Sequence, residues 1–281
     1  MEVSNKKSYM YILLSLFIFA FCIGNVNASE YTNYYGINMT EQEYNNLLNL
    51  GFTEDEIYYM SEESFELNKD NTATLVSKNQ KYYKTIYTDL NGSSYTTEIT
   101  KAEYDNQSMI DPRGTVNTTY KNIISTMSKL TSTFRYKVSV AWNRIPSTRS
   151  YDIIGVGFGD DVSIATPVYF TYHYCYSDGS CTNSTLNYGM KSLSTGGTAV
   201  YKIPSGDIRS LSSALYYDVE KDTTGTITSL EMCGDYSHAT STVTSTQYSG
   251  HSINITGILL GGYAGYYDAT PCAMSSWAGS W

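Results

Sequence analysis

The sequence has 281 residues and a formal net charge of −9, and only 16% of its residues are charged. Nearly all of this charge lies between residues 30 and 70, and the nearly neutral body that remains argues against nucleic-acid binding, which needs a concentrated basic face. Tyrosine is abundant, with 29 residues against 8 phenylalanines, and a composition rich in Tyr, Ser and Thr favours strands over helices. Heavy use of Asn, Lys, Tyr and Ile points to a bacterial source with an AT-rich genome.

The N-terminus has the pattern of a secretory signal peptide over residues 1–28. Lys6 and Lys7 precede an apolar run at 10–23, and Ala28 offers a small residue for cleavage. The run is short for a membrane span. We therefore expect a secreted or cell-surface protein that meets the membrane only through its signal, with an uncleaved anchor as the alternative.

Residues 29–70 form an acidic head, with ten acidic residues and one basic residue between 30 and 70. The motifs MTEQEY, FTEDEI and MSEESF each place a Ser or Thr where it can cap a helix, followed by acids that favour the helix N-terminus. Glu43 and Glu56 complete capping boxes. Helices this short are unstable alone, so they must pack together, dock on the body or fold on a partner. The three helices are expected at 41–50, 54–60 and 62–68. Whether the head is a pro-segment, a docking module or part of the fold stays open.

From residue 71 onward the pattern is that of strands. Residues 81–100 read as a hairpin around Asn91-Gly92, followed by a polar linker near 102–117. At 134–142 apolar and polar side chains alternate, which predicts a strand with one buried and one exposed face. Further strands are expected at 151–158 and near 198–203, 212–219, 225–232, 239–248 and 252–260.

This spacing predicts a mainly β protein whose core is an antiparallel β-sandwich. We expect the sandwich to span 118–281, preceded by a β-hairpin and linker at 71–117 and by the acidic three-helix head.

Four cysteines follow the signal, an even number that favours disulfides in a secreted chain. A three-residue turn at Ser177-Asp178-Gly179, with Gly179 left-handed, would place Cys175 directly opposite Cys181 on two paired strands. Directly opposed residues lie within disulfide range. A Cys233–Cys272 bridge then follows by elimination. A zinc or redox site is less favoured because the close C-x-x-C spacing is missing.

The weak candidates for catalysis are His238, Asp235 and His251. If they converged in the fold, they could bind a metal or, with Ser237 or another hydroxyl, activate a nucleophile for a secreted hydrolase. The sequence has no G-x-S-x-G and no H-E-x-x-H motif, and no cofactor is expected. For each histidine, including His173, a structural role is the favoured interpretation.

Abundant tyrosine also suits a non-catalytic binding protein, because exposed aromatic side chains make large, rigid contacts with sugars or proteins. The expected partner is a glycan, the cell wall or another protein. A pore-forming role is the second alternative to binding, after the hydrolase, because Ser/Thr-rich stretches such as TSTVTSTQY can form amphipathic hairpins. The segments LLNLGFTEDEI and TRSYDIIGVGF resemble parts of secreted proteins from low-GC Gram-positive bacteria, which implies no particular activity. Oligomeric state stays open.

Overall fold

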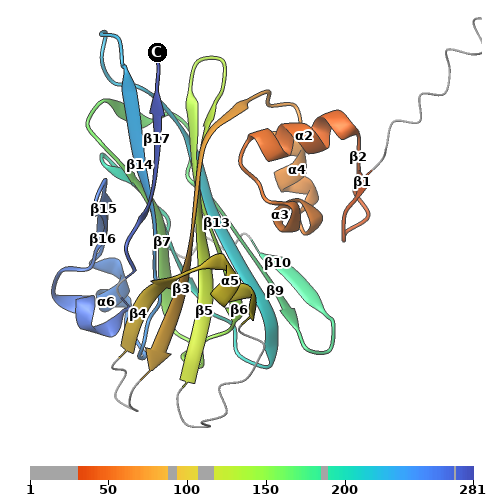
Figure 1. The fold of residues 1–281 in the computed structure, drawn as a ribbon, viewed down its shortest axis with the longest axis vertical. Coiled ribbons are helices and arrows are strands. Elements are labelled where there is room, and N and C mark those ends of the chain that lie inside the picture. The colour runs from red at the N-terminus through yellow and green to blue at the C-terminus, as the bar shows by residue number, and fades with distance from the viewer. Residues whose placement is uncertain (1–30, 88–93, 107–116, 185–188, 269) are drawn as a thin grey trace, which may run out of the picture.

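The chain folds as a β-sandwich with a small helical head docked on one outer face (Figure 1). The structure is a computed structural model, and it describes residues 31–87, 94–106, 117–184, 189–268 and 270–281. The predicted signal peptide and the predicted Asn91-Gly92 turn lie outside the described residues. The antiparallel pairing of both sheets confirms the predicted fold class.

The larger sheet has the strand order β10-β9-β13-β6-β5-β3-β4, and β8 pairs with the end of β13. Strands β3 and β4 form the predicted hairpin pair, and β3 also pairs along its length with β5, so the hairpin continues the sandwich sheet. A short helix, α5 (Lys101–Asp105), occupies the start of the predicted linker. The strands of this sheet are β3 (Thr74–Tyr87), β4 (Ser94–Ile99), β5 (Asn117–Lys129), β6 (Phe134–Arg144), β8 (Val162–Ile164), β9 (Tyr169–Tyr176), β10 (Cys181–Ser184) and β13 (Ile208–Lys221).

The smaller sheet has five strands in the order β11-β12-β7-β14-β17. They are β11 (Lys191–Leu193), β12 (Gly196–Lys202), β7 (Tyr151–Phe158), β14 (Ser229–Ser237) and β17 (Ala273–Ala278). The inner faces of the two sheets enclose one core of aliphatic and aromatic side chains, contributed mainly by β5, β6, β7, β13 and β14. Successive side chains of a strand point to opposite faces of the sheet, so the residues between these core positions face outward.

A hairpin of β15 (Ser252–Asn254) and β16 (Gly257–Leu259) lies on the outer face of the smaller sheet. Glycines on β7 permit this close approach. A Cβ at Gly155 would lie 2.6 Å from Ile253 Cδ1, and a Cβ at Gly157 would overlap the carbonyl oxygen of Asn254. The segment YDIIGVGF therefore reads as a strand whose outward glycines accept another backbone.

The acidic head contains the three capped helices that the sequence predicts: α2 (Glu41–Asn49), α3 (Glu54–Tyr58) and α4 (Glu62–Asn68). Thr40 with Glu43 and Thr53 with Glu56 form complete capping boxes, and Ser61 caps α4. A two-stranded ribbon, β1 (Tyr31–Thr32) with β2 (Asn38–Met39), precedes them.

The short helices were expected to pack together, to dock on the body or to fold on a partner, and the structure shows them docked on the body. Phe52 packs edge-on against Tyr216 of β13, with ring centroids 5.3 Å apart. The head and this strand share one buried apolar cluster, made of Met39, Leu47, Leu50, Phe52, Ile57, Met60, Phe65, Ala73 and Tyr216. Such burial supplies the stability that the isolated helices lack.

Docking explains one difference from the sequence-based expectation for β6. The predicted exposed face of this strand is largely buried, because Arg135, Lys137 and Ser139 lie beneath the head. Lys137 Nζ donates to both carboxylate oxygens of Glu56, at 2.8 and 2.7 Å. The Arg135 guanidinium binds Asp218 through two nitrogens. Each buried charge on this face thus has an acidic partner.

The chain differs from expectation again at 239–248, predicted as a strand. Much of this stretch is irregular, and helix α6 (Ser245–Ser249) begins at its end. The Gln247 side chain accepts from the Thr244 amide, 2.6 Å away, so a helix start replaces β pairing. The expected strand at 252–260 is the short hairpin β15–β16, followed by the 3-10 helix η2 (Gly261–Tyr266).

The Cys175–Cys181 disulfide is confirmed. The two residues are directly opposed on β9 and β10, with their Cα atoms 4.1 Å apart. The turn between them has the predicted form, because Gly179 adopts φ 88° and donates its amide to the Tyr176 carbonyl. The bulged turn and the disulfide therefore specify the same register.

Candidate functional site

An open groove of about 750 Å³ lies on the outer face of the larger sheet. Its floor is the sheet, one wall is α3 of the head, and α5 and the tip of the β9–β10 hairpin lie along its edges. Figure 1 shows the head on one side of β13 and α5 in front of β5 and β6. The groove exists because the head covers only part of the sheet face.

The floor is polar and mostly uncharged. It is formed by outward-facing side chains of four adjacent strands, β3, β5, β6 and β13. These are Lys78, Gln80, Asn122, Ile124, Ser139, Ala141, Asn143, Arg209, Ser210 and Ser212. Amide and hydroxyl groups can both donate and accept hydrogen bonds, so the floor can match a ligand rich in hydroxyls or amides.

The lip of the groove next to the head is a cluster of tyrosines. Tyr34 and Tyr58 have 42% and 47% of their surfaces exposed, and their ring centroids lie 6.1 Å apart. Tyr59 packs against both rings and stacks on His173 from the other side, at 3.7 Å. The rings therefore hold one another in place, and all three tyrosines line the groove.

His173 is held as a neutral side chain in this wall. Burial lowers its pKa to about 4, and its Nε2 lies 3.2 Å from Cys175 Sγ. His173, Cys175 and Cys181 offer three ligand atoms within 4.8 Å of one another, the spacing of a metal site. Both sulfurs are committed to the disulfide, however, and thiolates rather than disulfide sulfurs bind zinc.

The acidic side chains that line the groove all lie on one wall. They are Glu54, Asp55 and Glu56, consecutive residues of α3. Glu56 is already engaged by Lys137 and by the Ser139 hydroxyl, which donates to it at 2.7 Å. Glycoside hydrolysis needs two carboxyl groups that flank the scissile bond, and this arrangement does not provide them among the described residues.

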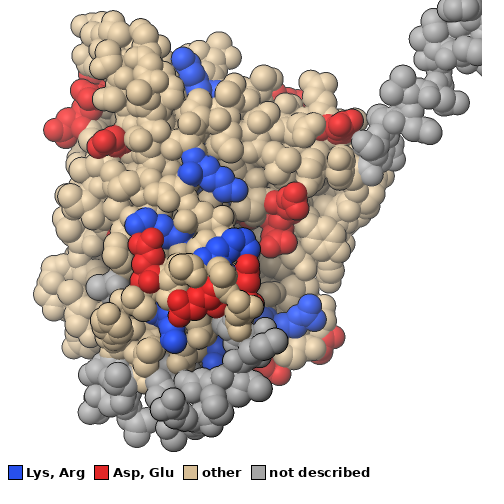
Figure 2. All heavy atoms as spheres, viewed as in Figure 1, with Lys and Arg blue, Asp and Glu red and all other residues tan. Residues whose placement is uncertain are grey.

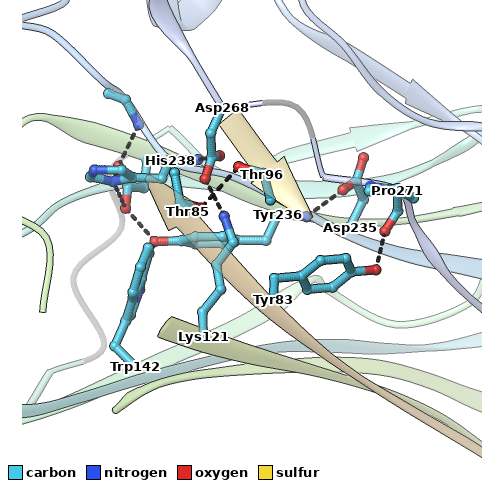
Figure 3. Close-up of polar contacts among 12 residues, drawn as sticks. Tyr83, Thr85, Thr96, Lys121, Trp142, Asp235, Tyr236, His238, Asp268 and Pro271 are labelled. Carbon is cyan, nitrogen blue, oxygen red and sulfur yellow. Dashed lines mark hydrogen bonds and ion pairs between the residues drawn. The ribbon is translucent and has the colours of Figure 1, made fainter. Parts of the chain in front are cut away.

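His238 lies elsewhere, in a buried polar cluster between the two sheets (Figure 3). Its Nδ1 is 2.9 Å from Asp152 Oδ1. Tyr236 also donates to Asp152, and Trp142 Nε1 donates to the Tyr236 hydroxyl at 3.2 Å. His238 has no exposed surface, so a substrate in the groove does not reach it.

The other two candidates occupy separate positions. Asp235 accepts from the Tyr236 and Ile258 amides, at 2.6 and 2.7 Å. Its pKa is raised to about 6 because burial disfavours the charged carboxylate. His251 contacts the Thr198 hydroxyl at 2.8 Å. Among the described residues no hydrogen bond joins His238, Asp235 and His251, so the geometry adds no support to the predicted catalytic cluster.

Cys233 and Cys272 are free thiols in the structure and lie beside one another. Strands β14 and β17 pair Cys233 with Met274 and Gly234 with Ala273, which makes the two cysteines diagonal neighbours. A hydrogen bond from Cys233 lowers the pKa of Cys272. The bridge between them remains a prediction, and their proximity is compatible with it.

The sequence pointed to tyrosine in general but not to the groove. Its walls come from α3, α5 and the β9–β10 hairpin, which meet only in the folded chain. A signal that could have been used is the pair Tyr58-Tyr59 within a head expected to dock.

In the part of the chain that the structure describes, no helix has the length and apolar character of a membrane span.

No protein-family model and no curated protein sequence matches the chain. A solved structure that was found similar is the collagen-binding domain of the Erysipelothrix rhusiopathiae surface protein RspB. The two are 7% identical, the TM-score is 0.24, and the match covers 58% of this chain and 66% of that chain, just under two thirds of its length. A similarity at this level supports no conclusion about ligand or partner.

Proposed function

We propose that this protein is a non-catalytic extracellular binding protein, and that it holds a polysaccharide strand in the groove. The observation that carries the proposal is the combination of a polar, mostly uncharged floor with exposed tyrosine rings at the lip. Sugar rings present both chemistries, since their hydroxyls can meet amides and hydroxyls while their apolar faces stack on aromatic rings.

Charge supports a neutral ligand over a nucleic acid. On the face seen in Figure 2, basic and acidic side chains are intermixed, and the atoms described there show no broad basic patch. Within the groove, the basic residues Lys78 and Arg209 are accompanied by the acidic residues of α3. A polyanion would gain little electrostatic attraction from such a surface.

The disulfide supports an extracellular location. Cys175–Cys181 lies at the rim of the groove, and disulfides persist mainly in oxidising compartments. This agrees with the signal peptide predicted at 1–28. By fixing the hairpin tip, the bridge also fixes one edge of the binding surface before a ligand arrives, which lowers the entropic cost of binding.

The test is calorimetric titration of the secreted chain with soluble oligosaccharides derived from chitin, cellulose and peptidoglycan. Tyr58→Ala and Tyr34→Ala should each weaken binding by roughly 5- to 10-fold, because one aromatic contact contributes about 1 kcal/mol. Tyr95→Ala is the matched control, since Tyr95 is 64% exposed on β4 and does not line the groove.

Three results would overturn the proposal. The first is binding that survives at wild-type strength in the Tyr34→Ala/Tyr58→Ala double variant. The second is no binding to any of the oligosaccharides. The third is shortening of a bound oligosaccharide during incubation, which would make the protein a hydrolase.

A further inference from the structure

Besides His238 and Asp152, the buried cluster contains an ion pair between Lys121 and Asp268. Lys121 projects from β5 and meets Asp268, which lies just before the final strand β17, so that Nζ and Oδ2 are in direct contact (Figure 3). The side chains are 1% and 0% exposed. The two residues are 147 positions apart in sequence. Their contact joins the larger sheet to the segment that leads into the last strand of the smaller sheet.

The surroundings of this contact are aromatic. The Lys121 Nζ lies 5.2 Å from the ring centroids of both Trp142 and Tyr236. Both rings are buried in the core between the sheets. The two charged groups therefore lack the solvation that water would give them and face each other directly. Transfer of one proton across the contact gives the neutral amine that a nucleophilic attack requires.

The second oxygen of Asp268 is held by the backbone. Asp268 Oδ1 accepts from the His238 amide at 2.8 Å, while the Asp268 amide donates to the His238 carbonyl at 2.9 Å. One carboxyl oxygen is thus polarised by a fixed N–H donor, and the other faces the amine. A donor at this position would stabilise the oxyanion that forms when a nucleophile attacks the carboxyl carbon.

We propose that Lys121 and Asp268 condense into an intramolecular isopeptide bond. In this step Nζ attacks Asp268 Cγ, a C–N bond forms and the Cγ–Oδ2 bond breaks. Of the three protons on the lysine ammonium, two leave with Oδ2 as one molecule of water and the third stays on the amide nitrogen. No oxidant, cofactor or other reactant is needed, because the atoms of the ion pair are those of the amide and the water.

Two features of the site favour the amide over the free pair. Fixed contact between the reacting groups acts as an effective concentration that reaches about 10⁵–10⁸ M in well-oriented intramolecular reactions. The buried position also excludes the water that would hydrolyse the product. Asp235 interacts electrostatically with both Lys121 and Asp268, so the pair is formed within a cluster of titratable groups.

A second buried ion pair in the same chain provides a natural control. Lys137 and Glu56 are also close, but both carboxylate oxygens of Glu56 accept from the lysine and the Ser139 hydroxyl adds a further bond. Glu56 is 14% exposed and lines the groove. The Thr53 amide donates to Oε2 and the Ser139 hydroxyl to Oε1, so neither oxygen of Glu56 faces the lysine alone. We expect this pair to remain ionic.

The experiment is mass spectrometry of the folded, secreted chain. After denaturation, reduction and alkylation, a tryptic digest should contain one branched peptide in which the Lys121 and Asp268 segments are joined. Its mass should be the sum of the two peptides minus one water, and unlinked forms should be almost absent. Lys121→Met and Asp268→Ala should lose the branched peptide completely.

Asp268→Asn keeps the shape of the side chain and guards against loss of folding in the other variants. It should form the same branched peptide with release of ammonia, so that its product has the mass of the wild-type product. A folded wild-type chain in which Lys121 and Asp268 appear only in unlinked peptides overturns the proposal. So does a mass deficit of one water that maps to Lys137 and Glu56.

Discussion

Asp235 shows how burial makes one residue a source of pH dependence. Its carboxyl group accepts two backbone amides, which favour the charged form, yet burial dominates and the pKa rises from 3.8 to about 6. The folded state therefore holds this proton more tightly than the unfolded state. The stability that results is fully present below pH 3.8 and is lost as the pH rises through 6.

The variant Asp235→Asn removes this titration. The free energy of unfolding of the wild type, relative to that of the variant, should fall by about 2–3 kcal/mol between pH 4 and pH 7. Urea denaturation of both proteins across this range measures the difference. The lowered pKa of His173 acts in the opposite direction, but it is present in both chains and cancels. A difference that does not change with pH would show that Asp235 is ionised throughout.

At the scale of elements, local pattern was sufficient where a segment carries its own signals. The capping boxes at Thr40 and Thr53 and the Cys175–Cys181 turn formed as predicted, because their partners are within a few residues. The outer face of β6 was not predictable in the same way. Arg135 and Lys137 look solvent-exposed in sequence, and only the docked head buries them.

The position of the β15–β16 hairpin depends on glycines in the strand beneath it. Gly157→Ala would place a Cβ against the Asn254 carbonyl, so the hairpin must move. We expect a loss of about 1–3 kcal/mol in unfolding free energy, the usual cost of overpacking a buried contact. Gly159→Ala is the control, because a Cβ there has no atom within 4 Å. Equal stabilities of the two variants, measured by thermal unfolding, would contradict close packing of the hairpin.

At the scale of the whole molecule, the head and the sandwich depend on each other through buried charge. Lys137 is fully buried on β6, and burial lowers its pKa while Glu56 from the head opposes that shift. No local sequence pattern predicts the contact between Lys137 and Glu56, because the two residues are 81 positions apart. The candidate groove was unpredictable for the same reason, since its floor and wall come from these two parts.

Glu56→Ala should loosen the head. It leaves Lys137 without its acid and removes half of the capping box of α3, for an expected cost of about 3–5 kcal/mol. Glu54→Ala, two residues earlier and exposed on the same helix, should cost less than about 1 kcal/mol. Chemical denaturation gives the two values, and hydrogen exchange over residues 41–68 shows whether the loss is local to the head. Similar costs for both variants would mean that the buried pair adds no specific stability.

Because α3 forms one wall of the groove and the sheet forms its floor, a ligand that touches both is thermodynamically linked to docking of the head. A ligand present at a free concentration of 100 times its dissociation constant would stabilise the docked state by about 2.7 kcal/mol. The linkage is reciprocal, so a change beneath the head that lowers the docked fraction lowers the apparent ligand affinity in proportion to that fraction, even from a residue that never meets the ligand. The interface beneath the head thereby limits the affinity of the surface beside it.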